Sequence, residues 1–244
     1  MGDNNFFKPK LVTPDHDPLK RLLGYGFIKA TDELDDQNET ALLRVGEIEK
    51  MGKGLFAKVD ITKKKRIFGA TGKEYLLRKG LDSKYDPTIE FIALGPNASM
   101  PNAICINEEY DPETQELSYR WLNPDDSNPL RVINHSCNPN TARLGPYAFF
   151  SRRDIGMGEQ ITADYSTLEI NPEWNMPCHC GEPNCRKIIG GVQTLPLAVA
   201  QEYWSEMPRF MQKLYVESLA GKSFDQGDQD VIKNLKIEMF KNLL

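Results

Sequence analysis

The sequence predicts a mostly β protein with α-helices added at its C-terminal end. Between residues 85 and 175, short apolar runs alternate with Pro, Asn, Gly and Asp, a pattern typical of short strands joined by long loops. After Gly191, apolar residues recur every three to four positions, which indicates amphipathic helices. The 244 residues are 40% hydrophobic, enough for a sizeable core in one large domain or two small ones.

Charge and the N-terminal residues limit the classes of function. The net charge is −5 and the isoelectric point is near 5.4, which argues against direct nucleic-acid binding and permits a basic protein partner. No apolar run approaches the roughly 18 residues of a membrane span. Because residues 1–8 lack the basic start and apolar stretch of a signal peptide, we expect an intracellular protein, cytoplasmic or nuclear, with no membrane partner.

The first half of the chain predicts an arm followed by strands. Residues 1–40 mix apolar and charged residues and end in an acidic, turn-like stretch, so we expect a loosely structured N-terminal arm. Residues 42–48 have the composition of a short strand, and Gly52 and Gly54 place a tight turn before the apolar run of residues 55–57. In an acidic chain, the basic run of residues 63–66 is better explained as a solvated turn than as a nucleic-acid patch.

The last 50 residues predict two helices. Apolar spacing predicts one amphipathic helix from Leu197 to Gly221, with Pro208 as a position for a kink. A second helix is expected over about residues 229–243. Its apolar face would consist of Val231, Ile232, Leu235, Met239 and Phe240. Core packing is the ordinary use of such a face, and a partner-binding groove or a lid is the alternative.

Five cysteines carry the first chemical signal. Cys178, Cys180 and Cys185 lie within eight residues, and the Gly, Pro and Asn between them permit sharp turns. Zn²⁺ prefers four tetrahedral ligands, so three thiolates are one ligand short. Cys137 is the best fourth candidate and His179 is its local rival. Such a zinc site would be structural, and Cys105, among apolar neighbours, would be a buried thiol.

Four segments, in order, resemble SET-domain protein-lysine methyltransferases with a post-SET zinc motif. Residues 131–140, Arg-Val-Ile-Asn-His-Ser-Cys-Asn-Pro-Asn, resemble one family signature, and residues 158–165, Gly-Glu-Gln-Ile-Thr-Ala-Asp-Tyr, resemble another. Residues 178–186 are similar to the post-SET zinc motif, and residues 52–57, Gly-Lys-Gly-Leu-Phe-Ala, to the opening turn. The resemblance implies a SET domain over residues 41–170, a post-SET zinc segment over 171–191 and C-terminal helices over 192–244.

The resemblance also implies a fold and a chemistry. The fold consists of small sheets of short strands, with two signature segments crossing in a pseudoknot. S-adenosylmethionine is the methyl donor, and a protein lysine amine is the acceptor. Methyl transfer from a sulfonium is an in-line displacement by a neutral amine. Because free lysine has a pKa near 10.4, the enzyme must deprotonate and align it.

By this resemblance, particular residues take particular roles. Tyr165 is the expected catalytic residue, with its hydroxyl at the methyl-transfer point, and Ala163 flanks the lysine channel. The ligands of the structural Zn²⁺ are Cys137, Cys178, Cys180 and Cys185. The expected donor-binding residues are Lys53, Gly54, Leu55, Arg131, Asn134, His135 and Ile189. Arg131 could instead only support its loop, His135 is expected to hydrogen-bond rather than act as a base, and Ile188 is an alternative to Ile189.

Three departures from the family pattern leave the function open. Ala163 replaces the usual Phe or Tyr, residues 68–75 replace a Tyr-x-Gly-Glu segment, and Lys187 stands where Gly often follows Cys-Arg. Tyr75 and Tyr110 are candidates to replace the missing tyrosine. The expected activity is methylation of a protein lysine, with a basic histone tail as one acceptor. The alternatives are a non-catalytic SET module that binds donor or a protein, and a SET fold acting on a small-molecule acceptor.

Overall fold

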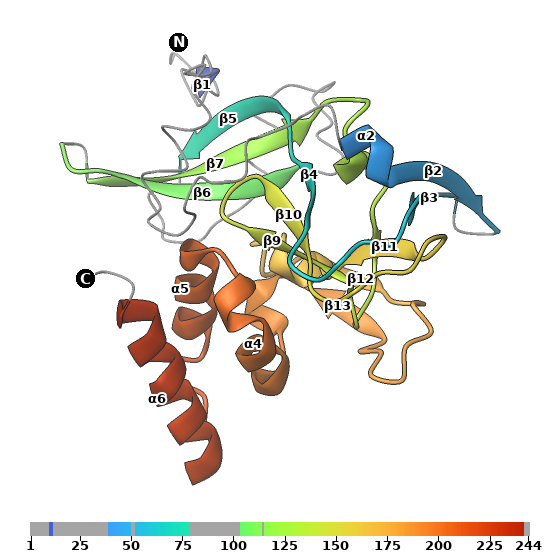
Figure 1. Cartoon of the computed structure of the whole chain (residues 1–244). Helices are drawn as coiled ribbons and strands as arrows, with labels where there is room; N and C mark the ends of the chain where they lie inside the picture. Colours follow the sequence, from blue (N-terminus) through green and yellow to red (C-terminus); the bar gives the residue numbers. More distant parts are fainter. Residues whose placement is uncertain (1–9, 12–38, 50–51, 79–102, 114, 242–244) are drawn as a thin grey trace.

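The computed structural model describes residues 10–11, 39–49, 52–78, 103–113 and 115–241 (Figure 1). Within these residues, short strands form three sheets of three or four strands and one two-stranded sheet, and most of the α-helical residues lie at the C-terminal end. The predicted mostly β architecture is confirmed. Apart from Lys10–Leu11 and residues 39–40, the expected N-terminal arm lies outside the described residues. No helix among the described residues is long and apolar enough to cross a bilayer.

One antiparallel sheet separates the two main parts of the core. Its strand order is β1 (Lys10–Leu11), β5 (Gly72–Arg78), β7 (Glu116–Pro124) and β6 (Ile104–Asp111). Successive side chains of a strand point to opposite faces. Accordingly, Ile104 and Leu122 pack into the β-rich core, whereas Cys105 and Trp121 pack against the C-terminal helices. The sheet is therefore buried on both faces.

The second sheet joins segments that are far apart in sequence. Its order is β2 (Leu43–Ile48), β3 (Gly52–Ala57), β11 (Gln160–Ala163) and β8 (Asn134–His135). β2, β3 and β11 pair antiparallel, whereas β8 and β11 pair parallel. The predicted strand over residues 42–48 is thus present, preceded by the short helix α2 (Glu39–Leu42).

Two smaller sheets complete the β region. β4 (Arg66–Gly69), β10 (Ala148–Ser151) and β9 (Thr141–Leu144) form one, and β12 (Asn175–Pro177) and β13 (Ile188–Gly190) form the other. Phe68 of β4 and Phe149 of β10 are fully buried and stack with ring centroids 4.5 Å apart. Residues 63–65 of the basic run form an exposed turn, as predicted, whereas Arg66 begins β4 and is half-buried.

The C-terminal segment differs from the prediction in two respects. The single helix expected over residues 197–221 is instead α4 (Leu197–Tyr203), the 3₁₀ turn η4 (Trp204–Glu206) and α5 (Arg209–Ser218). Pro208 precedes α5, where a proline without an N–H is tolerated, so it breaks the helix rather than kinking it. The amide of Gln212 donates to the Trp204 carbonyl at 2.6 Å and supports the break.

The last helix, α6 (Gln226–Lys241), starts three residues earlier than predicted. Val231, Leu235 and Met239 pack against the core, as expected from their spacing. Phe240 does not share that face, because its side chain is 57% exposed. Figure 1 shows α6 as the outermost of the three helices, away from the sheets.

Two arginines connect the helices to the β region. Arg152, after β10, binds Glu206 at 2.6 Å and Glu202 at 2.9 Å, and its guanidinium lies 4.1 Å from the Tyr203 ring centroid. Arg143 of β9 is 2% exposed and donates to the Cys105 carbonyl at 2.6 Å. Burial lowers the pKa of Arg143 to about 10. Arg152 thus ties α4 and η4 to the end of β10, and Arg143, which also donates to Met211 Sδ of α5 at 3.3 Å, ties β9 to both α5 and β6.

Candidate active site and cysteine cluster

Strand pairing brings the predicted donor-binding residues together at one sheet. In the registers of the β3-β11-β8 strands, Leu55 is opposite Ile161, and His135 is opposite Ala163. The amide of Asn134 donates to the Lys53 carbonyl at 3.0 Å. Residues 52–54, where the sequence predicted a tight turn, lie within strand β3. Strand pairing brings this strand beside Asn134 and Ala163, although Leu55 and Ala163 are more than 100 residues apart in sequence.

Gly54 lies where this sheet leaves no room for a side chain. A Cβ atom at Gly54 would come within 2.4 Å of the Ile48 side chain and 3.1 Å of the Asn134 amide nitrogen. A side chain at this position would require the end of Ile48 to move and the Asn134 amide to shift by a few tenths of an ångström. The glycine predicted to allow close approach of a ligand thus also keeps Asn134 in place.

Tyr165 lies between the β-rich core and the cysteine cluster. It begins the 3₁₀ turn η2 (Tyr165–Thr167), directly after β11, and packs against both groups of buried residues. Its hydroxyl donates to the Ile133 carbonyl at 2.7 Å. Burial raises the pKa of Tyr165 to about 12, so the hydroxyl is neutral at physiological pH. Its oxygen retains acceptor capacity for a second group.

His135 connects Tyr165 to the cysteines. Its Nδ1 accepts a hydrogen bond from the Tyr165 backbone N–H at 3.2 Å, and its Nε2 lies 3.3 Å from Cys137 Sγ. Burial lowers the pKa of His135 to about 4, even though Asp164 is 3.6 Å away. The ring is therefore neutral, and because Nδ1 accepts, the proton is on Nε2 and faces the sulfur.

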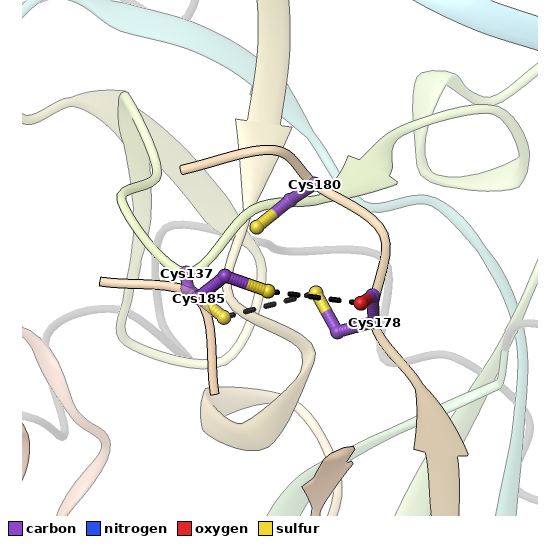
Figure 2. Close-up of side chains that lie close together, drawn as sticks. All are labelled: Cys137, Cys178, Cys180 and Cys185. Carbon is purple, nitrogen blue, oxygen red and sulfur yellow. Dashed lines mark hydrogen bonds between the residues drawn. The ribbon is translucent and has the colours of Figure 1, made fainter. Parts of the chain in front are cut away.

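Four cysteine side chains converge as the sequence predicted (Figure 2). The Sγ atoms of Cys137, Cys178, Cys180 and Cys185 all lie within 4.8 Å of one another. Cys137 and Cys178 are 3.8 Å apart, which matches the edge of about 3.8 Å for a tetrahedron with Zn–S bonds of about 2.3 Å. His179 is exposed and is not part of this group. The donor set and its spacing fit a tetrahedral zinc ion.

Several N–H groups donate hydrogen bonds to the sulfurs of this cluster. Arg186 directs its backbone N–H and its Nε to Cys137 Sγ at 3.4 and 3.5 Å. Burial tends to raise the pKa of Cys180, but hydrogen bonds at Cys137 and Glu182 outweigh it and lower that pKa to about 7. Burial raises the pKa of Cys178, so without a metal ion Cys180 loses its proton more readily than its neighbour Cys178.

One buried ion pair near this cluster had no role in the sequence prediction. Asp164 is 1% exposed and accepts from Arg186 Nη2 at 2.6 and 2.7 Å. Because Arg186 also contacts Cys137, the pair ties the turn at Tyr165 to the cysteine segment. The signal available in sequence was that both charged residues lie inside the quoted motifs, next to Tyr165 and Cys185.

Other predicted residues lie elsewhere or in other surroundings. Arg131 donates to the Pro124 carbonyl at 2.5 Å and to Asn123 at 3.3 Å, which fits the loop-supporting alternative. Ile189 is 2% exposed and packs with the cysteines, whereas Ile188 is 67% exposed and is the better placed of the two to cover a ligand. Tyr110 is 63% exposed at the end of β6.

Cys105 and Ala163 were singled out from the sequence, and both are buried. Cys105 is fully buried, and burial raises the pKa of its thiol, as expected for an unreactive cysteine. Ala163 is 2% exposed, and its carbonyl accepts from the Ser136 N–H at 3.1 Å. The side chain of Tyr75 lies outside the described residues.

Comparison with known proteins agrees with this geometry. Residues 52–166, which hold β3, Asn134, His135 and Tyr165, match the family model described as the SET domain. The chain carries a SET domain. The match ends before the cysteine segment of residues 178–185 and the C-terminal helices.

Curated relatives of this SET domain are named as histone-lysine N-methyltransferases. The H3 lysine-36 specific enzyme of Candida albicans is 34% identical over 133 residues, 46% of this chain and 15% of the relative. ASHH3 of Arabidopsis thaliana is 31% identical over 114 residues, 41% of this chain and 30% of the relative. ash1 of Drosophila melanogaster is 30% identical over 120 residues, 46% of this chain and 5% of the relative. The matched region thus spans less than a third of each relative.

Among solved structures, the methyltransferase domain of the human histone-lysine N-methyltransferase SETMAR is similar at 23% identity. The match covers 61% of this chain and 58% of the SETMAR chain, with a TM-score of 0.41.

Proposed function

We propose that this protein transfers a methyl group from S-adenosylmethionine to the side-chain amine of a protein lysine, with a histone as the acceptor. The observation that supports the proposal is the contact of Asn134 with Lys53 of β3, next to His135, which in turn contacts both Tyr165 and the cysteine cluster. A histone acceptor would place the protein in the nucleus. The net charge of −5 suits a basic tail.

Each residue has a distinct part in the proposed reaction. When bound, S-adenosylmethionine supplies an electrophilic methyl group. Asn134 and the main chain at Lys53 offer polar groups for its amino-acid end, and glycine at position 54 avoids a side chain that would crowd Asn134. The Tyr165 oxygen orients the acceptor amine by accepting a hydrogen bond, because its own proton is engaged by the Ile133 carbonyl.

The neutral state of Tyr165 also determines where the amine proton goes. Since the pKa of Tyr165 is raised to about 12, its phenolate is scarce at neutral pH and cannot serve as the base. His135, with a pKa lowered to about 4 and both ring nitrogens engaged, is a poor base as well. We therefore propose that the lysine proton leaves to water.

Cys137, Cys178, Cys180 and Cys185 would hold a structural Zn²⁺. The ion would add no reactive group, because four thiolates leave no open position for water. Its role would be to fix the segment that carries Arg186, and through Asp164 the turn that begins at Tyr165.

The test is methyl transfer from radiolabelled donor to recombinant nucleosomes. Nucleosomes in which the H3 lysine-36 site is arginine test whether this acceptor is shared with the relatives. We expect Tyr165→Phe to lower the rate about a hundredfold or more while donor binding, measured by calorimetry, persists. Donor binding without transfer to any histone would contradict the proposal and favour a non-catalytic module.

A further inference from the structure

An apolar groove lies on the C-terminal helices, away from the proposed active site. Its volume is about 780 Å³, and it runs between the end of α5, the following turn and the outer face of α6. Its apolar lining consists of Val216, Leu219, Phe224, Ile232, Ile237 and Phe240. None of these residues takes part in the site around Tyr165, so the groove needs another explanation.

Part of the α6 face that lines the groove is apolar and exposed, although Ile232 on the same face is buried. Leu235 is 3% exposed on the face toward the core, whereas Ile237 is 42% and Phe240 57% exposed on the groove side. Ile237 and Phe240 are three residues apart and are therefore neighbours on the helix surface, with Lys233 one turn before Ile237. An exposed apolar pair at the edge of an apolar groove is a candidate interaction site.

The charges around the groove are all of one sign. Lys233 and Lys236 line it, and no Asp or Glu is among its lining residues. The acidic residues of α6, Asp228, Asp230 and Glu238, lie outside the lining. Among the described residues, neither lysine forms an ion pair. In a chain of net charge −5, this basic edge is a local reversal of sign.

We propose that this groove binds an acidic amphipathic helix of a partner protein. The partner would insert apolar side chains spaced three to four residues apart between α5 and α6, and its carboxylates would pair with Lys233 and Lys236. A volume of about 780 Å³ accommodates several such side chains. Electrostatic complementarity with the two lysines favours an acidic partner over a neutral one.

Two other occupants fit the observations less well. A second copy of the same face across a two-fold axis would bring the two lysines of each copy into one interface with no carboxylate among the lining residues, and like charges repel. A bilayer contacts a flat or convex helix face, whereas this lining is concave and comes from two helices and a turn. An inserted helix is the occupant that uses both the hollow and the charge.

The experiment uses the full chain and a displayed library of random 16-residue peptides as the probe. We expect enriched peptides to carry apolar residues at i and i+3 or i+4 together with two or more acidic residues. The affinity of a labelled enriched peptide is then measured by fluorescence anisotropy. Phe240→Asp should weaken binding about tenfold or more, because it removes an apolar anchor. Circular dichroism checks that this exposed substitution leaves the fold intact.

The charge test has a matched control. Lys233→Glu with Lys236→Glu should weaken peptide binding several-fold at 50 mM salt, and the difference should shrink at 500 mM. Lys65→Glu with Lys73→Glu makes the same change in net charge at exposed residues outside the groove and should leave binding unchanged.

The proposal fails if no peptide is enriched, if enriched peptides lack acidic residues, or if Phe240→Asp leaves their affinity unchanged. It is also overturned if Phe240→Asp abolishes binding to vesicles containing phosphatidylserine, or abolishes a dimer seen by sedimentation velocity. These last two results would assign the groove to a membrane or to a second copy of the chain.

Discussion

The Nε2 atom of His135 lies 3.3 Å from the Sγ of Cys137, so one predicted metal ligand contacts the ring that also positions Tyr165. A neutral His135 cannot supply charge to the reaction, but through its two ring nitrogens it connects the position of Cys137 to that of the Tyr165 backbone. Loss of order at Cys137 would free the His135 ring, and the backbone N–H of Tyr165 would lose its acceptor. The order of the cysteine cluster therefore affects the position of Tyr165, the proposed catalytic residue.

The first prediction is that metal removal abolishes methyl transfer. We expect one Zn²⁺ per chain by elemental analysis, and a strong chelator should lower both activity and thermal stability, because the free energy of metal binding contributes to folding. Cys185→Ser should lose the ion, whereas Cys105→Ala should keep it, since Cys105 is buried elsewhere. Full activity in a chain shown to be free of zinc would contradict the coupling through His135.

The second prediction concerns pH. The rate should rise from pH 7 to pH 9.5 as the acceptor amine loses its proton, and ionisation of Tyr165 should not reduce it in this range, because burial raises the pKa of Tyr165 to about 12. The contribution of Tyr165 to stability should be lost as pH rises from about 10 towards 12, where the unfolded chain releases this proton and the folded chain retains it. The buried Cys105 thiol, whose pKa is also raised, acts in the same direction. A decline in rate below pH 9.5, with the fold intact by circular dichroism, would show that Tyr165 ionises earlier.

The sequence predicted the site better than it predicted the helices, for physical reasons. Spacing and turn residues grouped Cys178, Cys180 and Cys185 but left Cys137 and His179 as alternatives for the fourth position, and the structure brings Cys137 to the other three. The register of β8 on β11 depends on contacts across the fold, and only the family resemblance suggested that these segments meet. Apolar spacing alone could not show that Phe240 would remain exposed, because spacing does not reveal which face finds a neighbour.

The third prediction concerns the buried pair of Asp164 and Arg186. Arg186→Gln leaves the Asp164 carboxylate buried without its partner, so we expect a loss of about 3–5 kcal/mol in the free energy of unfolding, measured in urea. Asp164→Asn combined with Arg186→Gln should recover part of this loss, because no unpaired charge remains.

A matched control for this pair is Arg153→Gln. Arg153 and Glu159 are also ion-paired, at 2.6 Å, but their side chains are 50% and 33% exposed. Solvent screening limits the expected loss to about 1 kcal/mol or less. Equal losses for Arg186→Gln and Arg153→Gln would show that burial of Asp164 does not set the strength of the pair.

The last prediction concerns Lys187, which replaces the family's glycine after Cys-Arg. Its φ is +65°, the left-handed region that costs a non-glycine residue about 1–2 kcal/mol, and its carbonyl accepts from the Cys178 N–H at 2.7 Å. Lys187→Gly should therefore remove strain beside a zinc ligand, partly offset by about 0.4–1 kcal/mol of added freedom in the unfolded chain. We expect a net gain of up to about 1 kcal/mol, or a rise of roughly 2–4 °C in Tm, with slower loss of zinc to a chelator. Lys187→Ala removes the same charge but keeps the β-carbon, so an equal gain from alanine would mean that charge, not backbone conformation, is the cause.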